Sequence, residues 1–103
     1  MTATILGTLP VGSPPAPGGK SDVTIQEIQS DGTALSPNTV TITAPENTFT
    51  FTAAIGSTLK LTQVDTKVGG LPSNAVPTPD YVVENPMTAD PAGGIALTVV
   101  SVN

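Results

Sequence analysis

The chain has 103 residues with eight acidic residues, three lysines, no arginine and no histidine, so its formal net charge is −5. It has no cysteine, which excludes a disulfide framework and a thiolate metal site. Binding to nucleic acid or to an anionic membrane surface needs clustered basic residues, so we expect neither partner. The length suits one domain with a single hydrophobic core.

No stretch reaches the roughly 18 consecutive apolar residues of a membrane span. The segment Met1–Gly7 lacks the basic and long apolar regions of a secretory signal. We therefore expect a complete product made in the cytoplasm; the alternative is an excised domain with an added start methionine.

The first part of the chain combines a short apolar run with a proline-rich stretch. Thr2–Leu9 predicts a short strand, while Pro10–Lys20 holds four prolines and three glycines and forms neither a helix nor a central strand. We expect residues 1–20 to be an amino-terminal arm and linker, and residues 21–103 to be the folded body. The linker is either a plain surface loop or an arm that carries the first strand to a neighbouring subunit.

Val23–Ile28 predicts the next strand. Ile28 has the opposite parity to Val23 and Ile25, which indicates a bulge near Glu27 or the end of the strand. Asp31-Gly32 follows and predicts a turn, because glycine readily adopts the positive φ that such turns require.

The clearest pattern lies between Asn38 and Val64, where apolar residues and threonines alternate in three runs. Successive side chains of a strand point to opposite faces, so each run predicts a strand with one apolar face. The short connections Pro45–Asn47 and Ile55–Ser57 predict that the three strands pair in order as an antiparallel meander.

Beyond Val64 the pattern is broken by glycine and proline. We expect a long loop over Asp65–Asn74, with Ser73–Val76 beginning the next strand, then a renewed strand at Tyr81–Val83 and a loop over Glu84–Gly94. Ile95–Val102 predicts a final strand with apolar residues on both faces, which is either covered twice or paired across an interface. In all, seven to eight strands without a helix predict an all-β fold, an antiparallel β-sandwich.

Two stretches carry a family resemblance: Gly56–Asp65, and Gly69-Gly70-Leu71-Pro72-Ser73 after it. They resemble the penultimate strand and last hairpin of bacterial and phage immunoglobulin-like or fibronectin type III-like domains, and the resemblance covers about residues 21–83. Leu59 or Leu61 stands where the family has an aromatic residue. The resemblance implies an immunoglobulin-like sandwich with Ile95–Val102 as an added strand. Small domains of this kind resemble accessory proteins of tailed-phage virions.

The residue inventory argues against an enzyme. A nucleophile needs a neighbouring base, and only Lys20, Lys60 and Lys67 are basic side chains. A calcium site would need converging acids, such as Asp31 with Asp65 or Asp80 with Glu84 and Asp90, but no Asp-x-Asp-x-Asp spacing is present. We therefore expect no catalytic residue, no cofactor and no metal.

The sequence thus favours a structural protein of a virion, a capsid decoration (cement) protein that binds the major capsid protein or another virion protein and reinforces the lattice. Self-association is a further expectation. Apolar residues of the terminal segments, with Tyr81 as an interface anchor or a core residue, are the candidate partner-binding residues: Ile5, Leu6, Leu9, Val11, Tyr81, Met87, Ile95, Leu97 and Val99.

Three alternatives remain open. The first is a tail- or neck-associated phage protein, and the second is an adhesive or carbohydrate-binding module of a bacterial surface protein. A sugar site would usually offer aromatic platforms, and the chain has only three aromatic residues. The third is a cytoplasmic scaffold protein with an unknown partner.

Overall fold

A computed structural model describes residues 1–15, 18–66, 70 and 76–103. Within these residues the chain forms strands and no helix, and so no helix that could cross a membrane. The strands are β1 (Thr2–Thr8), β2 (Lys20–Ile28), β3 (Asn38–Thr43), β4 (Thr48–Ala54), β5 (Thr58–Thr66), β6 (Val76–Pro77), β7 (Tyr81–Val82), β8 (Thr88–Ala89) and β9 (Ala96–Val102). The prediction of an all-β fold is confirmed.

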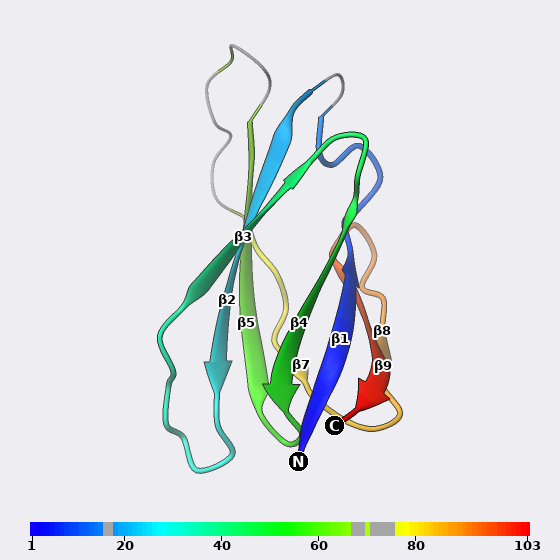
Figure 1. Ribbon diagram of the computed structural model, residues 1–103. Helices are drawn as coiled ribbons and strands as arrows, with labels where there is room; N and C mark the ends of the chain where they lie inside the picture. The colour runs from blue at the N-terminus through cyan, green and yellow to red at the C-terminus, as the bar shows by residue number, and fades with distance from the viewer. Residues whose placement is uncertain (16–17, 67–69, 71–75) are drawn as a thin grey trace.

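The strands form two antiparallel sheets (Figure 1). Sheet A has the order β4-β1-β9-β8, and sheet B has the order β3-β2-β5-β6, with β7 also pairing with β5. Both sheets contribute side chains to one hydrophobic core, since Ile5 and Leu97 of sheet A and Val23, Leu59 and Leu61 of sheet B are almost completely buried. The sheets therefore fold as one body.

The alternation in the segment Asn38–Val64 gives strands with the predicted faces. Ile42, Phe49 and Leu59 are buried, while the threonines between the apolar residues of β3 and β4 are exposed. An extended backbone that alternates oily and hydroxyl side chains can lie at the surface of a core without burying an unpaired polar group.

The predicted meander is wrong, however. β3 pairs with β2 in sheet B, β4 pairs with β1 in sheet A, and β5 pairs with β2 in sheet B again. At Gly56 a positive φ of 95° turns the chain from one sheet to the other, and Ser57 N donates to Ala54 O at 3.2 Å. A short connection can join strands within a sheet or between sheets, and the parity of the side chains is the same in both cases.

The amino-terminal segment is an inner strand rather than an arm. β1 pairs with β4 on one side and with β9 on the other, and Ala3, Ile5 and Leu9 are buried. The division at residue 20 therefore does not separate the first strand from the body. Leu6, which points outward, hid the alternation of β1 in the sequence.

Some of the remaining predictions agree with the structure and others do not. β2 ends at Ile28, so the strand end explains its parity, and Gly32 has the expected positive φ of 91° in the following turn. β9 matches the predicted last strand to within one residue, and within the predicted loop Glu84–Gly94 two residues form β8. Most of the predicted loop Asp65–Asn74, the residues Ser73–Ala75 of the expected next strand, and Gly69 and Leu71–Ser73 of the family resemblance lie outside the described residues.

Candidate functional site

The two sheets differ sharply in charge. None of the strands of sheet A contains a charged residue, although the chain as a whole carries eleven. In sheet B, β2 and β5 together carry Lys20, Asp22, Glu27, Lys60 and Asp65. Removing charged groups from water is costly, so sheet A is the sheet that a neighbouring molecule can cover with the least loss of solvation.

Outward side chains of sheet A that pair in register form an array, which we call the hydroxyl face; a bulge at the exposed Val100 interrupts it in β9, between Thr98 and Ser101. The strand registers place Leu6 between Thr50 of β4 and Thr98 of β9. Neighbouring strands are about 4.8 Å apart, and successive outward residues on one strand are about 6.8 Å apart. In rows across the sheet, the hydroxyl face consists of Thr52, Thr4 and Ser101, then Thr50, Leu6, Thr98 and Thr88, and then Thr48, Thr8 and Ala96.

All members of the hydroxyl face are at least partly exposed. The face combines hydroxyl and methyl groups around the leucine at its centre. It can therefore offer both hydrogen bonds and apolar contact over one surface. Sequence reasoning found only Leu6 of this set; the available signal was the absence of charge from residues 2–8, 48–54 and 96–102.

Most of the predicted partner-binding residues are core residues in this structure. The buried ones are Ile5, Leu9, Tyr81, Met87, Ile95 and Leu97. Leu6 and Val99 are partly buried, and Val99 packs against the core. Val11 is fully exposed. The predicted set is therefore divided between the core, the hydroxyl face and one turn, and does not form a single surface.

Val11 lies beside an open hollow of about 760 Å³ at one end of sheet A. The hollow lies between the segments Thr8–Val11 and Asp90–Gly94, so it is where the two terminal segments meet. Its lining is mostly proline, glycine and alanine, with Asp90 as the charged side chain. This composition provides little for binding a small molecule in a fixed orientation.

Tyr81 ties the two sheets together from inside the core. Its side chain is buried, and its hydroxyl donates a hydrogen bond of 2.7 Å to the carbonyl oxygen of Ile95, next to β9. Burial raises the pKa of the Tyr81 hydroxyl above its ordinary value. Of the two predicted roles of Tyr81, the structure shows the core role, with its hydroxyl paired.

Replacing Tyr81 by phenylalanine is expected to destabilise the fold by about 1–2 kcal/mol, because the ring remains while the buried hydrogen bond to Ile95 is lost. Urea denaturation followed by circular dichroism measures this change. An unchanged midpoint in Tyr81→Phe would show that the cross-sheet hydrogen bond contributes nothing.

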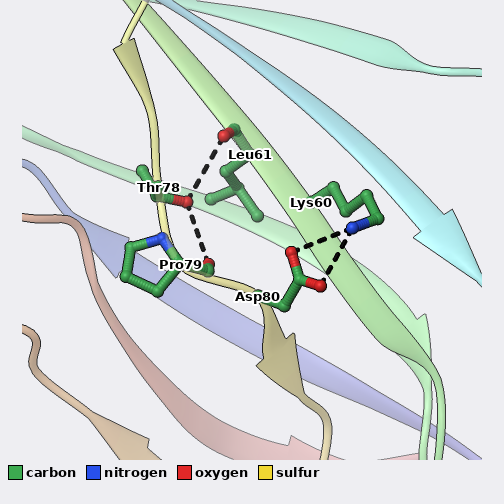
Figure 2. A network of polar contacts seen from close by, with 5 residues as sticks. All are labelled: Lys60, Leu61, Thr78, Pro79 and Asp80. Carbon is green, nitrogen blue, oxygen red and sulfur yellow. Dashed lines mark hydrogen bonds and ion pairs between the residues drawn. The ribbon is translucent and has the colours of Figure 1, made fainter.

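Lys60 and Asp80 form an ion pair on the outer side of sheet B (Figure 2). Lys60 Nζ lies 2.9 and 3.1 Å from the two carboxylate oxygens of Asp80, and Thr78 Oγ1 donates to the carbonyl oxygens of Leu61 and Pro79. The ion pair lies between the pairing of β5 with β6 and its pairing with β7, where Thr78 N also donates to Leu61 O at 3.0 Å. A shallow hollow of about 300 Å³ lies beside the pair. β5 is an inner strand of sheet B, so Lys60 does not lie on a free sheet edge.

Asp65 is the centre of a polar cluster at one end of sheet B. Its carboxylate accepts hydrogen bonds from Ser13 Oγ at 2.7 Å, Ser21 Oγ at 2.6 Å and Gln63 Nε2 at 2.9 Å. Burial acts to raise the pKa of Asp65, but the hydrogen bonds from Gln63, Ser21 and Ser13 outweigh it and hold the pKa below its ordinary value of 3.8. The cluster joins the proline-rich loop to β2 and β5, which is a structural role.

The acids considered as calcium ligands do not converge. Asp65 pairs in register with Ser21, near the start of β2, whereas Asp31 lies beyond the other end of β2 and accepts a hydrogen bond from Thr33 N at 2.9 Å. Asp80 is paired with Lys60, and Asp90 lines the hollow beside Val11. Within the described residues, no three acidic side chains gather closely enough to hold a metal ion.

Comparison of the chain with family models, with curated proteins and with solved structures gives no match.

Proposed function

We propose that this chain is a non-enzymatic structural protein that docks on a protein lattice through the hydroxyl face, as a decoration (cement) protein does on a phage capsid. The carrying observation is the distribution of charge: sheet A has no charged residue in its strands, while the strands of sheet B carry five. This asymmetry leaves one broad surface that a protein partner can cover without desolvating an ion.

Docking on the hydroxyl face would combine burial of Leu6 and the threonine methyl groups with hydrogen bonds to the threonine hydroxyls. Each such contact is modest, since a net hydrogen bond contributes about 1 kcal/mol. A lattice offers many equivalent positions, so weak contacts made by several linked copies persist. The proposed partner is the major capsid protein or another virion protein.

The architecture supports this proposal at the level of a β-sandwich. Two antiparallel sheets share one core, as in immunoglobulin-like domains. The strand order differs from the immunoglobulin order: β1 and β2 lie in different sheets and β1 lies between β4 and β9, whereas the first two immunoglobulin strands are neighbours in one sheet and the first lies at its edge. We propose that the likeness to immunoglobulin-like domains is one of architecture, with the strands connected in a different order.

A carbohydrate-binding module is less well supported by the placement of the aromatic residues. Phe49 and Tyr81 are buried, and Phe51 is partly buried and stacked on Phe49 with ring centroids 5.9 Å apart. None of the three offers an open ring on the surface for a sugar to stack on. We therefore favour a protein surface as the ligand, with a tail or neck protein as the second possible site in a virion.

Electron microscopy of particles that carry the protein and of particles from a strain lacking its gene tests the proposal. We expect additional density at regular positions on the shell, and loss of particle integrity at a lower temperature when the protein is absent. Identical maps together with identical heat stability would refute the reinforcing role.

Adding purified protein back to particles that lack it tests whether the hydroxyl face is the binding surface. Leu6→Glu places a charge at the centre of the hydroxyl face, and we expect it to weaken particle binding at least about tenfold. Thr24→Glu is the matched control, because Thr24 lies at the middle of β2 in sheet B. Equal binding by the two variants, with both folded by circular dichroism, would contradict docking through sheet A.

A further inference from the structure

β4 is an edge strand whose outer side is open. Among the described residues it pairs only with β1, and the hydrogen bonds of Asn47 O with Leu9 N and of Ile55 N with Met1 O show that its odd-numbered residues direct their backbone groups toward β1. Backbone groups alternate in direction along an antiparallel strand. The N–H and C=O groups of Thr48, Thr50 and Thr52 therefore point away from sheet A.

At the carboxyl end of β4, the outward backbone groups already have hydrogen-bond partners in the same chain. Ala54 N donates to Glu27 Oε2 at 3.0 Å, and Ala54 O accepts from the backbone N and Oγ of Ser57. For Thr48, Thr50 and Thr52, no hydrogen bond of an outward backbone group is found within the described residues. The open part of the edge is thus a defined segment of five residues, Thr48–Thr52.

This open segment is a sequence palindrome, Thr-Phe-Thr-Phe-Thr. Two identical strands that pair antiparallel about a two-fold axis place each residue opposite its mirror position. We propose that β4 pairs with β4 of a second copy of this chain, centred on Thr50. Thr50 then faces Thr50 of the second copy, Thr48 faces Thr52, and Phe49 faces Phe51.

The pairing satisfies the open backbone groups as well as the side chains. Each threonine pair exchanges two backbone hydrogen bonds, so all outward groups from Thr48 to Thr52 gain partners. Facing aromatic residues and facing threonines both stabilise antiparallel pairs. Phe51 is only partly buried and borders a hollow of about 100 Å³, lined also by Ile25 and Leu35, at this edge. An added strand would cover these apolar groups.

A second copy of this chain can pair with β4 because this edge of the sheet carries no charge. Two chains of net charge −5 repel each other over most of their surface, but β4 and its neighbour β1 are uncharged. The natural edge defences, lysine, proline and a bulge, are all absent from Thr48–Ala54. Acids lie just outside the paired segment, since the two-fold brings Glu46 of one copy toward Glu27 of the other, so we expect salt to strengthen the association.

Cysteine cross-linking of the purified chain tests the register. The chain has no cysteine of its own, so each variant adds a single thiol. We expect Thr50→Cys to give a disulfide-linked dimer under mild oxidation and Thr48→Cys to give none, because residue 48 faces residue 52. A mixture of Thr48→Cys with Thr52→Cys should again cross-link. Equal, slow cross-linking of all these samples would overturn the proposal.

A charge-swap experiment tests the same axis without a covalent bond. Thr50→Lys and Thr50→Glu each place like charges opposite each other, and we expect each to raise the dimer Kd at least about tenfold in sedimentation equilibrium. Mixing the two variants should restore the dimer, while Thr41→Lys on the edge strand β3 should leave association unchanged. A parent chain that sediments as a monomer at all concentrations refutes the pairing. None of these measurements uses a lattice, so the pairing and the proposed function can fail separately.

Discussion

Phe49→Ala is expected to lower the free energy of unfolding by about 3–5 kcal/mol, the range for removing a buried phenylalanine. Phe49 is buried in the core, and its ring lies directly over Gly7, its partner in the β1–β4 register. The ring thereby covers a strand position that has no side chain of its own. Urea denaturation of parent and variant measures the change, and Phe51→Ala, which removes a partly exposed ring, should cost less.

The contact between Phe49 and Gly7 can also be tested by changing the glycine. A methyl group at Gly7 would overlap the Phe49 ring, so Gly7→Ala alone is expected to destabilise by about 1–3 kcal/mol through overpacking. In the Phe49→Ala background the same methyl group has room, and the cost of Gly7→Ala should nearly vanish. Strictly additive costs would show that the ring does not depend on the glycine.

The strands could be predicted because the information is local. In β3, β4 and β5 the alternation of threonine with apolar residues fixes which side chains face the core, whatever the partner strand is. The sheet to which each strand belongs depends on distant pairing, such as β1 with β9, and no residue pattern in either strand encodes that pairing. This is why the strands were right and the meander was wrong.

The surface was harder to predict than the core. Apolar residues of the terminal segments were predicted to bind a partner, but inner strands bury side chains such as Ile5 and Leu97. Leu6 was among them only because it is apolar. The hydroxyl face becomes visible once the registers bring β1, β4 and β9 side by side, since a single strand shows only that it is uncharged.

β4 takes part in both proposed contacts through different groups. Its threonine side chains belong to the hydroxyl face, while its outward backbone groups form the open edge. A pair of chains joined at β4 would extend sheet A without covering this face, and the area available to a lattice would double. Dimer formation would then strengthen docking through linkage of two sites, with no new contact to the lattice.

Asp65→Ala is expected to destabilise the fold by about 2–4 kcal/mol, because hydrogen bonds to a charged group are strong and their buried donors would lose their acceptor. Ser21 is completely buried, Gln63 nearly so, and both donate to Asp65. Asp80→Ala is the matched control: it breaks an ion pair whose two side chains are about half exposed, and such pairs contribute at most about 1 kcal/mol. Equal losses in the two variants would contradict a special role for the Asp65 cluster.

The pH dependence of stability gives a second readout of the same carboxylate. The hydrogen bonds hold the pKa of Asp65 in the folded chain below its ordinary value of 3.8, so the folded state binds this proton less readily than the unfolded state does. The stability from Asp65 is therefore fully present above that ordinary value and is lost as the pH falls through the folded pKa. Asp65→Asn removes this titration, so we expect its free energy of unfolding to fall less steeply with acid than that of the parent. Parallel curves for the two proteins would show that the carboxylate charge is not what holds the proline-rich loop, β2 and β5 together.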